Sequence, residues 1–182
     1  ADVALYSGDY ETAITSGNAV IAKANDAYFT SEGISNLWAK DSYAGRIFAF
    51  NTHSTYYSNI LFSIQEGDYF CVNPKLNVGT SDLRYTSFTY PFVMNGTVRT
   101  LLGKYNRCNK LNQTTAYINT MRYAGAYYIV AEAYCRKGET EAARVLINHY
   151  WHCIGVSEAP AGITNQALLE LILTDKQREF VG

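Results

Sequence analysis

MRYAGAYYIVAEAYCRKGETEAARVLINHYW, residues 121–151, decides the fold because it contains two helical patterns joined at Lys137-Gly138. Small and apolar residues recur at helical spacing, at Met121, Ala124, Tyr128, Ala131 and Cys135 in the first pattern and at Ala143, Leu146, Ile147, Tyr150 and Ile154 in the second. Gly138 supplies the permissive backbone that ends the first helix, and Glu139 places a negative charge in the first turn of the next. The stretch predicts a helical hairpin of the tetratricopeptide type.

Residues 1–24 repeat this hairpin pattern. Gly8-Asp9 corresponds to Gly138-Glu139, and an alanine stands five positions after each glycine, at Ala13 and at Ala143. The two copies are too far apart for a tandem array, so a segment is inserted between them. We therefore expect one partial domain over 1–182, with a helical hairpin at 1–24, an insert at 25–119, and a hairpin plus a terminal helix at 120–182.

The insert is rich in Gly, Asn, Ser, Thr and Tyr and poor in helix formers. Residues 46–50 and 97–102, the latter running on to 104–105, have the composition of short strands, and turn signals stand at Asn73-Pro74, Val78-Gly79, Tyr90-Pro91 and Asn95-Gly96. Long loops in compact domains usually bind something. The predicted fold class is mainly α, with helical hairpins and a loop-rich insert that contains short strands.

Residues 164–180 predict a terminal helix with Asn165 as its N-cap and an apolar face formed by Leu169, Ile172, Leu173 and Phe180. Asp175 and Glu179 share a face at i, i+4, and Arg178 can relieve their repulsion. A catalytic carboxylate pair is one interpretation. We favour a structural ion-pair network of Asp175, Arg178 and Glu179, because nothing nearby supplies a nucleophile or oxyanion donors.

Charge and hydropathy argue against a nucleic-acid-binding protein and against a chain that spans or adheres to a membrane. The net charge of −1 gives no electrostatic attraction for nucleic acid or an anionic membrane. No stretch approaches the roughly 20 apolar residues that span a bilayer. Both ends lie inside helical patterns, which favours a piece of a longer protein, with any targeting segment outside it.

His149 and Cys153 share one helix face at i, i+4, a spacing that suits a metal pair. No third ligand stands at a matching position, so helix packing is favoured and no metal site is predicted. The four cysteines, Cys71, Cys108, Cys135 and Cys153, lack CxxC spacing. Phosphate-loop, GxSxG and HExxH motifs are also missing from the sequence, so we predict neither catalytic residues nor a cofactor.

Aromatic residues are abundant, with 16 Tyr, 8 Phe and 2 Trp, and those of the insert stand beside short polar residues. A sugar stacks its C–H face on a flat ring and takes hydrogen bonds from carboxylates and amides. The alternative is that these rings only attach long loops to the helices. The candidate ligand-binding residues are Tyr56, Tyr57, Asp68, Tyr69, Asp82 and Tyr85.

Four stretches resemble a known family in the same order. The first is Ala4-Leu5-Tyr6-x-Gly8-Asp9-Tyr10 with Ala13-Ile14. The second is Asn36-Leu37-Trp38, followed by Asp41 and Arg46-Ile47-Phe48-Ala49-Phe50. The third is Asp82-x-Arg84 with Gly103-Lys104-Tyr105. The fourth is Arg122-Tyr123-Ala124 and Ala131-Glu132-Ala133-Tyr134, then Ile172 and Asp175-Lys176-x-Arg178-Glu179-Phe180. Together they resemble the SusD-like (SusD/RagB) outer-membrane nutrient-binding proteins of Bacteroidetes. The sequence departs from the family at two of these positions. Arg46 stands where the family usually has an acidic residue, and Asp175 stands where it usually has Glu.

The resemblance implies a cell-surface lipoprotein that covers a TonB-dependent transporter and captures a glycan, or sometimes peptides, for import. It implies a mostly helical fold with tetratricopeptide-like hairpins under loop-borne binding residues, no catalysis, and a lipid anchor outside this chain. Binding positions vary within the family, so none is transferred here by motif.

Three functions compete at this point. The first is a glycan-binding component of an uptake complex that captures an oligo- or polysaccharide, and the second is a helical-repeat scaffold that binds a protein or peptide. The third is a glycoside hydrolase using Asp68 and Asp82, which is the weakest because the insert has no convincing carboxylate pair.

Overall fold

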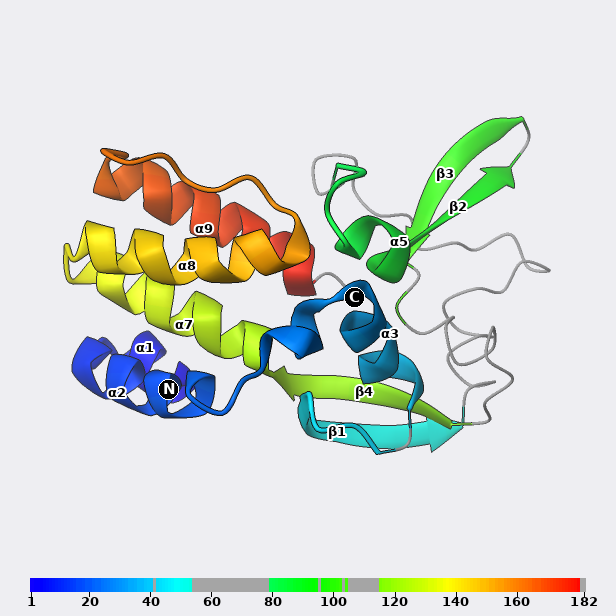
Figure 1. Ribbon diagram of the computed structural model, residues 1–182, viewed down its shortest axis with the longest axis horizontal. Coiled ribbons are helices and arrows are strands. Elements are labelled where there is room, and N and C mark those ends of the chain that lie inside the picture. The colour runs from blue at the N-terminus through cyan, green and yellow to red at the C-terminus, as the bar shows by residue number, and fades with distance from the viewer. Residues whose placement is uncertain (41, 54–78, 95, 103, 105–114, 181–182) are drawn as a thin grey trace.

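The computed structural model of the chain describes residues 1–40, 42–53, 79–94, 96–102, 104 and 115–180 (Figure 1). The helices are α1 (Asp2–Ser7), α2 (Tyr10–Ile21), the 3₁₀ helix η1 (Asp26–Phe29), α3 (Ser31–Ala39), α5 (Arg84–Phe88), α7 (Tyr123–Arg136), α8 (Thr140–Ile154) and α9 (Asn165–Phe180). The strands are β1 (Arg46–His53), β2 (Thr89–Met94), β3 (Thr97–Leu102) and β4 (Thr115–Arg122). The described part is thus mainly helical, as predicted.

Helix α7 lies at the centre of the helical layer, with α2 packed on one side and α8 and α9 on the other (Figure 1). Its small residues Ala124, Ala131 and Ala133 are buried, so neighbouring helices approach its backbone closely. Tyr128 and Val130 are fully buried between them. The predicted hairpin is confirmed in α7 and α8.

Glycine turns end the first helix of both hairpins. Gly8 and Gly138 have φ angles of 81° and 80°, in the left-handed region that costs glycine nothing. The Asp9 side chain then caps α2 by accepting a 3.1 Å hydrogen bond from the Thr12 amide. The correspondence between the two Gly-acid pairs in the sequence is therefore a real correspondence of backbone geometry.

Two predicted helix boundaries are wrong. Met121 belongs to β4, where it pairs with Phe48 of β1 and is 59% exposed, so α7 begins at Tyr123. This pairing joins distant parts of the chain, and local periodicity cannot reveal it. Asn165 is the first residue of α9, and the Thr164 hydroxyl accepts the capping bond from the Ala167 amide at 3.3 Å.

The insert contains more regular structure than its composition predicts. The strands predicted at 46–50 and 97–102 are confirmed in β1 and β3, which form antiparallel pairs with β4 and β2, respectively. The sequence patterns do not predict helices η1, α3 and α5 or strands β2 and β4. Helix α3 begins where the Thr30 hydroxyl accepts a 3.1 Å hydrogen bond from the Gly33 amide.

Aromatic packing attaches η1 to the helical layer and α3 to α5. The Phe29 ring of η1 lies edge-on at 5.1 Å from Tyr150 and 5.6 Å from Tyr127. Trp38 of α3 meets Phe88 of α5 edge-on at 6.0 Å. Much of the tyrosine content of the helices therefore serves the core.

Among the described residues, the helices are all too short or too polar to cross a membrane.

Close contact between α2 and α7 predicts different effects for two glycine substitutions. A Cβ at Gly17 would overlap the Val130 side chain, whereas a Cβ at Gly125 meets Phe180 at an ordinary 3.6 Å. We expect Gly17→Ala to lower the free energy of unfolding by about 1–3 kcal/mol through overpacking. Gly125→Ala serves as the matched control and should change stability little or raise it by up to about 1 kcal/mol, because alanine favours helix. Denaturant unfolding measures both, and equal effects would contradict the close α2–α7 packing.

Candidate functional site

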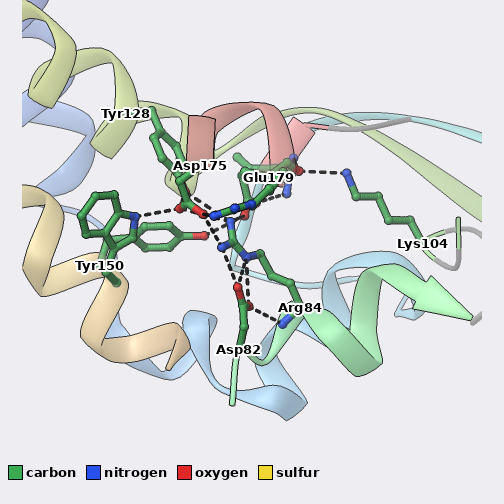
Figure 2. A network of polar contacts seen from close by, with 10 residues as sticks. Asp82, Arg84, Lys104, Tyr128, Tyr150, Asp175 and Glu179 are labelled. Atoms are coloured by element: carbon green, nitrogen blue, oxygen red, sulfur yellow. Dashed lines mark hydrogen bonds and ion pairs between the residues drawn. The ribbon is translucent and has the colours of Figure 1, made fainter. Parts of the chain in front are cut away.

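A buried cluster of charges lies where α9 meets α5, α7, α8 and β4 (Figure 2). Leu168 and Ile172 begin the buried stripe of α9, and Asp175 and Glu179 continue it at the same helical spacing. These two carboxylates are only 2% and 1% exposed. Leu168 is therefore the buried leucine of this turn, instead of Leu169, which the sequence pattern predicts for the apolar face. The C-terminal half of the buried stripe is acidic.

Arg84 is the central cation of the cluster. Its Nη2 donates to Asp82 Oδ2 at 2.7 Å and to Asp175 Oδ1 at 2.6 Å. Its Nε also donates to Asp82, and its Nη1 lies 3.3 Å from Glu179 Oε2. A planar guanidinium with donors on several edges suits three carboxylates better than an ammonium would. Figure 2 shows Arg84 between Asp82 and the two carboxylates of α9.

Two more cations hold the end of α9. Arg122, the last residue of β4, donates from Nη1 to Glu179 Oε1 at 2.5 Å and from Nη2 to the Glu179 carbonyl at 3.1 Å. Lys104 Nζ donates to the same carbonyl at 2.8 Å. This carbonyl belongs to the last turn of the helix, whose C=O groups have no backbone N–H donor within the helix. The two cations therefore close the C-terminus of α9.

Ring donors from α7 and α8 complete the cluster. Tyr128 OH and Trp151 Nε1 donate to Asp175 Oδ2 at 2.5 and 2.7 Å, and Tyr150 OH donates to Glu179 Oε2 at 3.0 Å. Buried carboxylates are tolerated when charges and hydrogen bonds satisfy them. The cluster thus joins helices that are distant in sequence.

Burial shapes the electrostatics of these groups. By itself it lowers the pKa of Arg84, but the hydrogen bonds to Asp82 and the surrounding negative charges outweigh it and raise the net pKa. For Lys104, burial and then the charge of Arg122 hold the pKa well below its usual value. Burial also raises the pKa values of Tyr128 and Tyr150, which keeps both phenols protonated as donors.

The residues predicted from the sequence fall into three groups. Tyr56, Tyr57, Asp68 and Tyr69 lie outside the described residues. Asp82 is buried against Arg84, whereas the adjacent Tyr85 is 40% exposed. Asp175 and Glu179 lie in the cluster, with Arg178 at its edge, 3.8 Å from Asp175.

The sequence pattern indicates Arg178 as the partner of the acidic pair, but the shorter ion pairs to Asp175 and Glu179 come from Arg84 and Arg122. Arg84, Arg122 and Lys104 lie far from α9 in the sequence, and no local spacing connects them with it. They do stand in the stretches that carry the family resemblance, as Asp82-x-Arg84, Arg122-Tyr123-Ala124 and Gly103-Lys104-Tyr105. Their positions in these stretches are the sequence feature that could have identified them, but the resemblance assigns no role to the three residues.

A cavity of about 310 Å³ adjoins the cluster, between residues 79–82, α8 and α9. Asp82, Trp151 and Arg178 contribute to its lining, together with Ser157. Its volume is at the lower end of the range of about 300–1,000 Å³ for ligand pockets. Arg178 Nε is buried and has no hydrogen-bond acceptor among the described residues.

Removing the central cation should destabilise the protein strongly. Arg84→Met leaves three buried carboxylates short of a partner, and we expect the free energy of unfolding to fall by about 3–5 kcal/mol. Glu141→Gln, which removes an exposed ion pair with Arg144, is the control and should change the stability little, because solvent screens exposed ion pairs. Chemical denaturation of both variants measures the difference. Similar losses would mean that the cluster does not organise the fold.

Comparison with known proteins agrees with this architecture. A model described as the SusD family matches residues 12–182. The structure of a SusD-like carbohydrate-binding protein from Bacteroides vulgatus has a TM-score of 0.76 at 22% identity, covering 98% of this chain and 40% of that one. A SusD superfamily protein from Bacteroides thetaiotaomicron has a TM-score of 0.74 at 17% identity, covering 100% and 45%. No curated protein matches in sequence.

The chain thus spans less than half of the length of both solved structures. Their similarity extends over the helical layer and the insert together, which gives this chain a partial SusD-like fold. Because the family model extends over nearly all of the sequence, the protein belongs to the SusD family.

Proposed function

We propose that the protein is a non-catalytic glycan-binding component of a nutrient uptake complex on the outer membrane surface. In this proposal it captures an oligo- or polysaccharide and passes it to a TonB-dependent transporter, and a lipid anchor outside this chain attaches it to the membrane. The single observation that supports it is the family match over residues 12–182, since SusD proteins are typically non-catalytic binding proteins. The B. vulgatus relative is itself described as carbohydrate-binding.

Local geometry supports a role for residues 79–88 in positioning ligand contacts. The Leu83 amide donates to the Ile154 carbonyl at 2.9 Å, at the end of α8. The next residue, Arg84, is fixed by the buried cluster. Tyr85 follows directly and is exposed, so its ring is held on a rigid support at the surface. A preorganised ring binds a sugar face with little loss of side-chain entropy.

In the proposed site, Tyr85 acts together with Tyr56, Tyr57, Asp68 and Tyr69, as rings beside carboxylate acceptors. Asp82 contributes differently, because its oxygens bond Arg84. We assign it the role of holding Arg84, and with it the backbone that presents Tyr85.

One observation favours the second candidate, a scaffold that binds a protein. Phe48 and Phe50 are exposed on β1, with ring centroids 5.1 Å apart, and Met121 is exposed opposite Phe48 on β4. Neighbouring apolar side chains on a surface are typical of protein contacts. The transporter of the first proposal would use the same row, and the glycan measurement that follows separates the two candidates.

A glycan array with the intact protein tests the proposal. We expect binding to a restricted set of glycans, and Tyr85→Ala should weaken it about 2- to 12-fold, the loss of roughly 0.5–1.5 kcal/mol from one ring contact. Tyr6→Ala is the matched control, because Tyr6 is an exposed tyrosine on α1, away from Arg84. This variant should bind the glycan as the wild-type protein does. Capture by a transporter without any glycan binding would favour the protein scaffold instead.

A hydrolase would release new reducing ends from a bound glycan. We expect none, because Asp82 is buried in an ion pair with Arg84 that engages both of its carboxylate oxygens. A reducing-end assay on the bound glycan makes the measurement. Turnover that disappears in Asp68→Asn would overturn the non-catalytic assignment.

A further inference from the structure

Three side chains that can bind metal meet on the surface of α8, outside the charge cluster. His149 and Cys153 stand one turn apart on α8, and Asp26 begins η1. His149 Nε2 lies 3.1 Å from Asp26 Oδ1. The three ligand atoms, including Cys153 Sγ, all lie within 4.8 Å of one another.

We propose that Asp26, His149 and Cys153 form a binding site for a divalent transition metal ion, with Zn²⁺ as the ion that suits them best. The sequence contains only the His149–Cys153 pair, and the third ligand comes from a segment far away in the chain. The fold therefore supplies the residue whose absence argued against a metal site.

The donor set fits zinc chemistry. An imidazole nitrogen, a thiolate sulfur and a carboxylate oxygen are the three ligand types that Zn²⁺ takes in proteins, and bonds of about 2.0–2.3 Å place tetrahedral ligands about 3.3–3.8 Å apart. The observed nitrogen–oxygen distance of 3.1 Å is close to this. Cys153 Sγ lies within 4.8 Å of the other two ligand atoms, so a side-chain movement of about 1 Å would bring it to the tetrahedral spacing. Three protein ligands leave one position for water, as in open zinc sites.

The surrounding structure fixes the ligands on a rigid base. Phe29 packs between Tyr127 and Tyr150, which holds η1 against α7 and α8. The Tyr127 ring stacks on His149 with centroids 6.0 Å apart and planes at 22°, which limits the orientation of the imidazole. Sites on packed elements hold ligands more precisely than sites on loops.

A bound Zn²⁺ supplies the positive charge that stabilises both the thiolate and the carboxylate. A bound ion would also tie η1 to α8 and so stabilise the folded chain.

The simpler interpretation is an exposed ion pair between Asp26 and His149, which does not use Cys153. Zn²⁺ titration against a chromophoric chelator separates the two interpretations. We expect one site that is weakened at least about 100-fold in Cys153→Ser and in Asp26→Asn, because even residues that only support metal ligands cost about 10- to 100-fold when changed. His152→Ala is the matched control: His152 is the exposed neighbouring histidine, lies 3.1 Å from Glu158, and should leave the affinity unchanged.

Two further readouts test the same ligands. The Co²⁺ form should show a thiolate-to-metal charge-transfer band that is lost in Cys153→Ser, and Zn²⁺ should raise the thermal midpoint of the wild-type protein but not of that variant. Circular dichroism of each variant without metal verifies that it is folded. Equal Zn²⁺ affinity in the wild-type protein and Cys153→Ser, or a Co²⁺ complex without the band, would overturn the proposal in favour of the ion pair or of binding elsewhere.

Discussion

The contact of Arg84 with Asp82, Asp175 and Glu179 is the constraint on which the rest of the described structure depends. Burying so many charges is costly unless each one is paired and hydrogen-bonded. That condition can be met only when α5, α9 and β4 reach one place together with the ring donors of α7 and α8. The network consequently specifies one arrangement of these elements, because any shift would leave a buried charge without its partner.

Helix α7 makes this convergence feasible. Its alanines allow α2 and α8 to approach closely, and Gly17 on α2 faces Val130 without a side chain of its own. The same helix delivers the Tyr128 hydroxyl to Asp175. Close apolar packing excludes water from the charges, and low water content strengthens their mutual attraction. Core packing and the charge network therefore depend on each other.

The two proposed binding surfaces use this support in different ways. Tyr85 stands directly after Arg84, so the network places an exposed ring on a fixed backbone. The Asp26, His149 and Cys153 cluster rests on the aromatic contacts of Phe29 instead. A glycan surface and a metal site can thus coexist on one scaffold without sharing a residue.

The sequence by itself determined the elements whose causes are local. The α7–α8 hairpin, the glycine turns at Gly8 and Gly138, strands β1 and β3 and the terminal helix all follow from periodicity, propensity and turn chemistry within short windows. Four stretches in order also indicated the family. Tertiary structure alone decided that Met121 joins a strand, because its pairing with Phe48 is long-range. It likewise decided that Arg84 and Arg122 pair with the buried carboxylates of Asp175 and Glu179, and that Asp26 lies next to His149. The partners of an ion pair and the ligands of a metal must lie close together in space. Their spacing in the sequence predicts such closeness only when they belong to the same helix or strand.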